Sequence, residues 1–447
     1  MPPNVIVFFT DQQRHDTTGV HGNPLDLTPN FDRIAQRGTH LFNTFTPQPV
    51  CGPSRACMQT GKYATTTGCY RNGIPLPDGE KTLAHYFKKA DYDTAYIGKW
   101  HLADDTYDGA VPEKERGGYE SWLGANLLEF VSDSYDLHLF NNDNEDVKLP
   151  GYRVDAQTDA AISYLNRDRE KPFFLFLSYL EPHHQNHLDD YPPPDGYRER
   201  YTGRWIPPDL AALGGSTHQH LGGYYGMVKR LDEALGRLLD ALKSLEQLND
   251  TVIAFTSDHG CHFKTRNGEY KRSCHESSVR VPLALQGPGF DAGGQVRDLV
   301  SLIDLPPTLL DAAGIPIPKA MQGRSFLPLV QKQTSEWLED VFIQISETQV
   351  GRAVRTQRWK YGVVAEEADP WHDMSAERYT EAYLYDLQVD PYELSNLAGF
   401  ATHREVSGAL KERLMKRMVA AGEQEPVIEA APERHGNPQL RASAESV

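Results

Sequence analysis

Four stretches with the composition of strands constrain the fold of this chain more than any other feature. They cover residues 5–9, 92–97, 172–179 and 251–256, and the first is a continuous run of β-branched and aromatic residues. Apolar runs of this length are typical of strands buried on both faces of a parallel sheet. Segments with helical periodicity lie between them, at residues 28–38, 82–90, 152–166 and 220–245. This alternation predicts the α/β class, with a large mixed, mostly parallel sheet flanked by helices.

The last part of the chain has a different pattern. Short apolar runs separated by polar turns favour a small antiparallel sheet, at residues 341–347, 352–356, 359–364 and 381–386. A helix is expected at 403–421, with an extended tail from about 422. We therefore predict a catalytic α/β domain over residues 1–335 and a smaller C-terminal subdomain, with its tail, over 336–447. Residues 104–150 and 191–213 are expected to be loops.

Polar side chains follow each apolar stretch at the point where the strand should end. They are Asp11-Gln12, Lys99 and His101, His183, and Asp258-His259. Ligand sites in open α/β sheets lie at the carboxyl ends of the strands, so these residues are expected to meet. Asp11 and Asp258 are candidate metal ligands, although Asp11 would also suit a simple cap on the segment that follows.

The stretch Cys51-Gly52-Pro53-Ser54-Arg55 is the most unusual motif in the chain. Pro53 bends the backbone, and Gly61 can end a short helix that begins here. Cys51 would then lie at a helix N-terminus, where the partial positive charge favours an anion. Arg55 adds a full positive charge one turn further on. Taken alone, the motif also fits a buried cysteine in a turn.

This motif, followed by Thr60-Gly61, resembles the signature of the formylglycine-dependent type I sulfatases of the alkaline phosphatase superfamily. Four further segments fit the family in the same order: Gly98-Lys99-Trp100-His101, Pro182-His183, Asp258-His259, and Lys271 with Glu276 and Arg280-Val281-Pro282. The resemblance implies a sulfuric ester hydrolase that ends in a small antiparallel domain with a helix. It also implies that a maturation enzyme oxidises Cys51 to formylglycine.

The resemblance assigns roles to the catalytic residues. The hydrated formylglycine would attack sulfur with one hydroxyl, and deprotonation of the second hydroxyl would expel sulfate. Arg55, Lys99 and Lys271 would hold the negative charge, and His101 would be the base for the second step. His183 would protonate the leaving oxygen, alone or together with Lys271.

The resemblance also supplies a metal site and a substrate pocket. A divalent cation, Ca²⁺ or alternatively Mg²⁺ or Mn²⁺, would be held by Asp11, Gln12, Cys51, Asp258 and His259. Substrate contacts are expected from Arg71 and Asn72, in a loop that borders the pocket in the family. His275 is also expected to contact the substrate, although it would equally suit simple packing.

Three substrate classes compete. A sulfated mono- or oligosaccharide is favoured by the polar and aromatic loop residues. A small aryl or alkyl sulfate is the second class, and a phosphonate monoester or phosphodiester, suggested by Asp11-Gln12, is the third. An inactive binding protein of this fold would be expected to have lost Cys51, Arg55 or a metal-binding aspartate, and this chain retains them all.

Composition excludes several other functions. A net charge of −17 argues against nucleic acid as a partner, because phosphate binding needs basic patches. Five cysteines without a Cys-x-x-Cys pair do not form a disulfide framework, and no apolar stretch is long enough for a membrane span. As written, the chain is expected to be cytoplasmic, or periplasmic or secreted if a signal peptide has been removed. The oligomeric state is left open.

Overall fold

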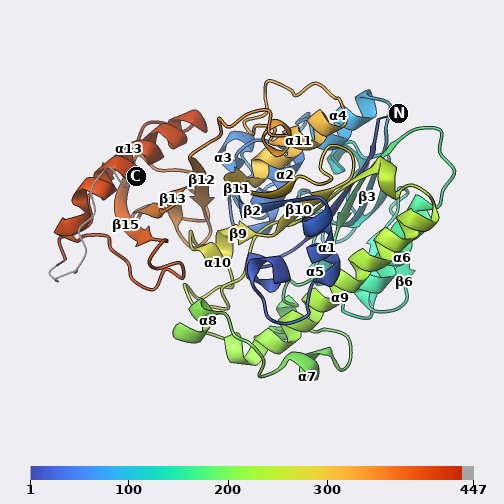
Figure 1. Cartoon of the computed structure of the whole chain (residues 1–447), viewed down its shortest axis with the longest axis horizontal. Coiled ribbons are helices and arrows are strands. Elements are labelled where there is room, and N and C mark those ends of the chain that lie inside the picture. The colour runs from blue at the N-terminus through green and yellow to red at the C-terminus, as the bar shows by residue number, and fades with distance from the viewer. Residues whose placement is uncertain (1, 435–447) are drawn as a thin grey trace.

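The computed structural model describes residues 2–434 and contains two sheets (Figure 1). The large sheet has the strand order β11-β2-β10-β8-β1-β7-β3-β4-β5-β6, with β9 paired to β2. Its centre is made of parallel strands from the four apolar stretches: β8 (Thr251–Ser257), β1 (Asn4–Thr10), β7 (Phe173–Ser178) and β3 (Asp93–Lys99). The predicted α/β class with a mostly parallel sheet is confirmed.

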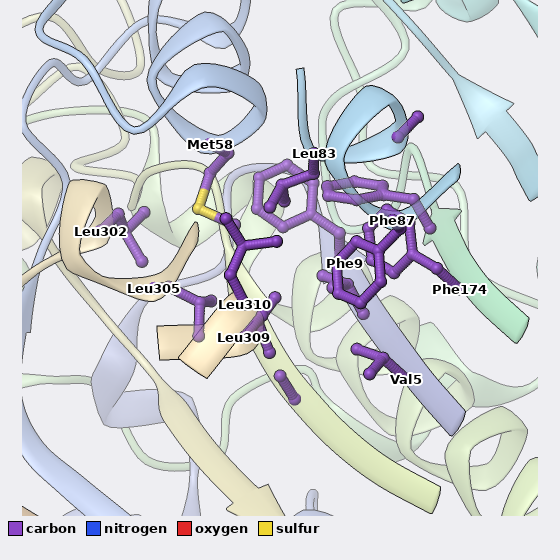
Figure 2. Packing of buried hydrophobic residues seen from close by; sticks show 14 of the residues in the cluster. Val5, Phe9, Met58, Leu83, Phe87, Phe174, Leu302, Leu305, Leu309 and Leu310 are labelled. Atoms are coloured by element: carbon purple, nitrogen blue, oxygen red, sulfur yellow. The ribbon is translucent and has the colours of Figure 1, made fainter. Parts of the chain in front are cut away.

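The alternating side chains of β1 pack into separate cores on the two faces of this sheet. Val5, Val7 and Phe9 join one core, and Ile6 and Phe8 join the other. The first core is closed by α2 (Cys51–Thr60), α4 (Leu83–Lys89) and α11 (Leu305–Ala312). Figure 2 shows residues of these helices packed with those of β1 and β7.

The second core is covered by three helices that the sequence pattern predicts well. They are α1 (Pro29–Arg37), α6 (Arg153–Leu165) and α9 (Thr217–Ser244), and each contributes its apolar side to the core. With helices over both faces, the central strands are almost entirely buried, which explains why apolar residues predominate in them.

The edges of the large sheet differ from the prediction. The region 104–150, expected to be a loop, contains β4 (Ser121–Ala125), α5 (Leu128–Val131), β5 (Leu137–Phe140) and β6 (Asp146–Leu149). These elements are short and partly exposed, so their sequences lack a long apolar run. The region 191–213 likewise contains two short helices, α7 (Tyr197–Tyr201) and α8 (Pro208–Ala212).

The remaining elements of the large domain complete the other edge and the connections. The strands are β2 (Thr39–Phe45), β9 (Arg280–Val281), β10 (Leu283–Gln286) and β11 (Gly294–Ser301). The short helices are α3 (Ala64–Thr67), α10 (Glu276–Val279) and α12 (Leu327–Val330). Within the described residues, no helix combines the length and the apolar character that crossing a membrane requires.

The small sheet lies beside the large domain (Figure 1). Its antiparallel strands are the four expected ones: β12 (Asp340–Ile345), β13 (Val350–Thr356), β14 (Trp359–Ala365) and β15 (Arg378–Asp386). The helix α13 (Arg404–Ala420) packs on this sheet. The expected tail adds β16 (Val427–Glu429), parallel to β15, and its residues 435–447 lie outside the described part of the chain.

The two sheets share an apolar cluster. Phe45, Val279 and Leu299 from the large domain pack against Val341 and Ile343 of β12. The small sheet is therefore joined to the large domain by a buried interface.

Candidate active site

The carboxyl ends of the central strands bring the predicted residues together. Asp11 follows β1, Lys99 ends β3 and Asp258 follows β8. Lys99 Nζ lies 2.9 Å from Asp11 Oδ2. The guanidinium of Arg55 lies 3.0 Å from Asp11 Oδ2 and 3.3 Å from Asp258 Oδ2. All four side chains are buried, so each charge depends on the others for stabilisation.

Cys51 is the first residue of α2 and faces this charged group. Its Sγ lies 2.8 Å from Lys271 Nζ, 3.4 Å from His259 Nε2 and 3.6 Å from Asp11 Oδ1. Burial opposes ionisation of the thiol, but Lys271, Lys99 and His259 hold the pKa of Cys51 well below its usual range. Residue 51 therefore lies in a positive environment at a helix N-terminus.

Four side chains form a group that could hold a metal ion. The ligand atoms of Asp11, Cys51, Asp258 and His259 all lie within 4.8 Å of one another, and all four residues are buried. Burial and the like charge of Asp11 raise the pKa of Asp258 to about 6. Asp258 Oδ2 pairs with Arg55 at 3.3 Å but accepts no hydrogen bond from any described residue. Two buried carboxylates beside an imidazole are donors that a divalent cation can bind, so the donor set fits such an ion.

The tautomer of His259 also fits a metal site. Its Nδ1 lies 2.9 Å from the carbonyl oxygen of Gly260, which can only accept a hydrogen bond, so Nδ1 carries the proton. Nε2 then carries a lone pair, which accepts from Lys271 Nζ at 3.1 Å, and the nearest carboxylate oxygens of Asp11 and Asp258 lie 3.6 and 3.5 Å away.

Gln12 lies beside this group with its side-chain oxygen available. Its Nε2 donates to the hydroxyl of Tyr191 at 2.9 Å and to Cys261 Sγ at 3.3 Å. Its backbone N–H donates to Asp258 Oδ1 at 3.0 Å. The buried Oε1 has no hydrogen-bond partner among the described residues, which suits its predicted role as a ligand.

Two histidines lie where proton transfer is expected. His183 Nε2 lies 3.2 Å from Lys271 Nζ, and burial together with Lys271 lowers the pKa of this histidine. His101 lies two residues after Lys99, and its backbone has a φ of +58°. Both line the same cavity as Cys51.

A cavity of about 260 Å³ opens above Cys51. Arg71, Asn72 and Lys271 line it, as expected of substrate-binding residues. The residues lining it do not include Arg55 and Lys99, which contact the buried carboxylates instead.

The structure does not support the substrate contact that was expected of His275. His275 does not line the cavity, and its ring nitrogens contact Ser273 Oγ and the hydroxyl of Tyr385, each at 3.1 Å. It directly precedes α10 and packs against Tyr383 and Tyr385 of the small sheet. His275 is therefore a packing residue, the alternative that its sequence position left open.

The structure adds site residues that sequence reasoning missed. Glu129 of α5 is buried in the cavity wall and pairs with Lys99 Nζ at 2.8 Å. Phe130 and Trp371 also line the cavity, with exposed fractions of 57% and 42%. All three come from segments without a regular pattern, and the aromatic character of the 104–150 region was the only available signal for Phe130.

Comparison with known proteins agrees with this geometry. The sequence profile of the family described as Sulfatase matches residues 3–315, and the profile described as N-sulphoglucosamine sulphohydrolase, C-terminal matches residues 268–420. The chain is 29% identical over 441 residues to an ulvan-active sulfatase of Formosa agariphila, covering 94% of this chain and 82% of the relative. It is 26% identical to an N-acetylglucosamine-6-O-sulfatase of Bacteroides thetaiotaomicron, covering 92% and 85%.

A solved structure has the same fold over nearly the whole chain. It is the structure of a protein in complex with its substrate D-glucosamine-2-N,6-O-disulfate. The two folds superpose with a TM-score of 0.78, at 24% sequence identity, covering 95% of this chain and 99% of the other.

Proposed function

The chain belongs to the sulfatase family, and from this premise we propose that it removes sulfate from a sulfated mono- or oligosaccharide. The observation that carries the proposal is the rim of the cavity above Cys51. There Trp371 and Phe130 expose 42% and 57% of their surface, beside the polar side chains of Arg71, Asp105 and Asn186. Aromatic faces pack on the apolar faces of sugar rings, and the polar groups can bind ring hydroxyls.

The named substrates of similar proteins support this class. Relatives are described as acting on ulvan and on N-acetylglucosamine 6-O-sulfate, and the similar solved structure holds a disulfated glucosamine. These proteins match this chain over most of its length.

In this proposal residue 51 acts as formylglycine, formed from Cys51 by a maturation enzyme. When hydrated, formylglycine supplies an oxygen nucleophile and a second hydroxyl that allows sulfate release. The chain's own residues do the rest. Lys271 binds sulfate oxygens, and its Nζ, 3.2 Å from His183 Nε2, shares with this histidine the task of delivering a proton to the leaving oxygen. His101, which lines the same cavity, accepts a proton from residue 51.

A divalent cation completes the site. Asp11, Gln12, Asp258 and His259 would hold it together with residue 51, and the ion would supply positive charge to the sulfate group. Oxygen donors predominate, so Ca²⁺ is the proposed ion. Mn²⁺ is the ion to compare with Ca²⁺, because the imidazole of His259 is a nitrogen ligand and such ligands suit transition metals better.

A substrate panel tests the proposed sugar. Purified protein is assayed for sulfate release from sulfated monosaccharides and disaccharides and from an aryl sulfate, and for cleavage of a phosphonate monoester. We expect the highest kcat/KM on one of the sugars. Fast phosphonate cleavage without sulfate release from any sugar would contradict the proposal and favour the third substrate class.

The Trp371→Ala variant tests the rim separately. Loss of a stacking platform should lower kcat/KM on the preferred sugar by about 10-fold, because burying about 60 Å² of apolar surface is worth about 1.5 kcal/mol. Activity on the aryl sulfate should change little, because a small ester does not reach the rim. Tyr392→Ala is the matched control, since Tyr392 is equally exposed, at 41%, but does not line this cavity.

A further inference from the structure

Three consecutive residues of the small sheet contact the loops that form the active site. Ser346, Glu347 and Thr348 lie in the connection between β12 and β13, and we call them the β12–β13 clamp. The loops they contact precede Cys51, contain Asn72, and contain Lys271 and Arg272. These loops are far apart in the sequence and belong to the large domain.

The carboxylate of Glu347 joins two of these loops. Its Oε1 accepts the backbone N–H of Asn72 at 2.7 Å, and its Oε2 pairs with the guanidinium of Arg272 at 2.5 Å. The side chain is fully buried, so it depends on these two partners for stabilisation. Hydrogen bonds to a buried carboxylate are stronger than those between neutral groups.

Both partners of Glu347 lie next to residues that contact or adjoin residue 51. The side-chain oxygen of Asn72 accepts the backbone N–H of Gly52 at 2.9 Å, which fixes the first turn of α2 next to residue 51. Arg272 follows Lys271, whose Nζ lies 2.8 Å from Cys51 Sγ. A shift of Glu347 would therefore move the nucleophile and the sulfate-binding lysine relative to each other.

The neighbours of Glu347 hold the same loops. Ser346 Oγ accepts a hydrogen bond from Gln48 Nε2 at 2.7 Å, and Thr348 Oγ1 donates to the carbonyl oxygen of Arg272 at 2.7 Å. The backbone N–H of Glu347 donates to the carbonyl oxygen of Pro370 at 2.9 Å, directly before Trp371 of the rim.

The backbone at both ends of the ion pair is in the left-handed region. The φ angles of Glu347 and Arg272 are +66° and +70°. This conformation is unfavourable for residues with a side chain, and it persists where surrounding contacts hold the backbone in place. Here the contacts of the β12–β13 clamp hold Glu347 and Arg272 in this conformation.

We propose that Glu347 is a positioning residue for sulfate ester hydrolysis, through which the small sheet sets the distance between residue 51 and Lys271. The inference rests on the sulfatase chemistry of the site and not on the proposed sugar. It can therefore be tested with an aryl sulfate, whose reaction needs only the sulfate-binding part of the cavity.

Two substitutions at position 347 test the proposal in a graded way. Glu347→Gln keeps the shape and an acceptor for Asn72 but loses the charge that holds Arg272. Glu347→Ala removes both contacts. A misplacement of about 1 Å can cost about 100-fold in rate, so we expect kcat/KM to fall about 10-fold in the Gln variant and about 100-fold in the Ala variant. The fall should lie mainly in kcat, because the displaced groups act in the transition state.

Asp386→Asn is the matched control. Asp386 is a buried carboxylate of the same sheet, at the end of β15, and pairs with Arg358 at 2.7 Å away from the cavity. Its substitution should lower the Tm without changing kcat/KM of the folded protein. Rates are divided by the fraction of residue 51 that is converted to formylglycine, measured by peptide mass.

The outcomes distinguish a role in positioning the catalytic groups from a role in stability alone. A Gln variant with reduced Tm but wild-type kcat/KM per converted site would overturn the proposal, and so would an equal loss of kcat/KM in the Asp386→Asn control. The isosteric Gln variant gives this answer even if the Ala variant does not fold. Wild-type protein that cleaves the aryl sulfate but no sugar would contradict only the proposed sugar.

Discussion

His183 is the residue whose removal should distinguish good from poor leaving groups. A sugar alcohol needs a proton as it leaves, whereas an acidic phenol does not. We expect His183→Gln to lower kcat on a sugar or alkyl sulfate by about 10²–10⁴-fold, the usual contribution of a general acid. The loss on a nitrophenyl sulfate should be much smaller, as measured by steady-state kinetics on both substrates.

The neighbouring histidine provides the control for this experiment. The rings of His183 and His184 stack with centroids 4.4 Å apart, and both line the cavity. Of these two histidines, His183 is the one whose Nε2 lies 3.2 Å from Lys271 Nζ, so His184→Gln should not show the dependence on leaving group. An equal loss on both substrates in the His183 variant would argue for a binding role.

Removal of the cation should destabilise the folded protein. The carboxylates of Asp11 and Asp258 are both buried beside each other, and a bound ion relieves their repulsion. An ion present at 100 times its Kd contributes about 2.7 kcal/mol to stability. We expect a chelator to lower the Tm, and Ca²⁺ or Mn²⁺ to restore it, in thermal unfolding of the protein.

The Asp258→Asn variant is the control for metal binding. It retains the shape of the side chain but loses half of the carboxylate charge in the group, so its Tm should respond weakly to chelator and added ions. A wild-type Tm that does not change with chelator would contradict the presence of a metal at this site.

The site residues that could be predicted from sequence are those that follow a buried strand. Asp11, Lys99 and Asp258 each come directly after an apolar run, and parallel strands place their carboxyl ends at one edge. Glu129 and Trp371 could not be predicted in this way. They reach the cavity from a four-residue helix and a turn, where nothing in the local sequence specifies direction.

At the scale of elements, a carboxylate of α9 caps the first turn of α1. The oxygens of Asp232 accept the backbone N–H groups of Asn30 and Phe31, at distances from 2.8 to 3.1 Å. Replacement by Ala leaves these buried donors without partners. We expect Asp232→Ala to lower the free energy of unfolding by about 1–3 kcal/mol in chemical denaturation.

The same carboxylate should give a measurable pH dependence. Burial raises the pKa of Asp232 from 3.8 to about 6, although the N–H donors oppose this shift. Between these values the folded state binds more protons than the unfolded state, so the contribution of Asp232 to stability falls as pH rises from about 4 to 6. In Asp232→Asn this component should be absent, and an unchanged pH profile would contradict the shift.

The elements predicted correctly are long and either uniformly apolar or strongly periodic. α9 is an example, because its buried positions recur with helical period along 28 residues. β5 and β6 are four-residue strands; β5 alternates buried and half-buried side chains, and β6 alternates exposed and half-buried ones. They form because β4 offers an edge to β5, which in turn pairs with β6. Pairing of this kind is decided by tertiary contacts, which the local sequence does not contain.

At the scale of the whole molecule, the small sheet is part of the active site. Its sequence predicts strands and a helix but not which surface they contact. The contacts of Glu347 with Asn72 and Arg272 join residues separated by 275 and 75 positions along the chain. Such contacts follow only from the three-dimensional arrangement of the two sheets.

A buried ion-pair network at the interface of the two sheets should contribute strongly to stability. Lys360 of β14 is fully buried, with Nζ 2.8 Å from Glu276 of α10 and 2.6 Å from Glu393. Lys360→Met would leave buried carboxylates without this cation. Breaking a buried pair in this way typically costs about 3–5 kcal/mol, so we expect a loss of that size in chemical denaturation.

The same charge argument predicts how the loss is reversed. Glu393→Gln in the Lys360→Met background removes the charge that has lost its cation, because Glu276 still pairs with Arg355 at 3.4 Å. The amide oxygen can still accept the backbone N–H of Glu276, which Glu393 accepts at 2.7 Å. The double variant should therefore recover part of the lost stability.

Lys148→Met, which breaks an exposed pair with Asp136, should cost no more than about 1 kcal/mol. Equal losses in the two lysine variants would show that burial of the Lys360 network does not determine its contribution.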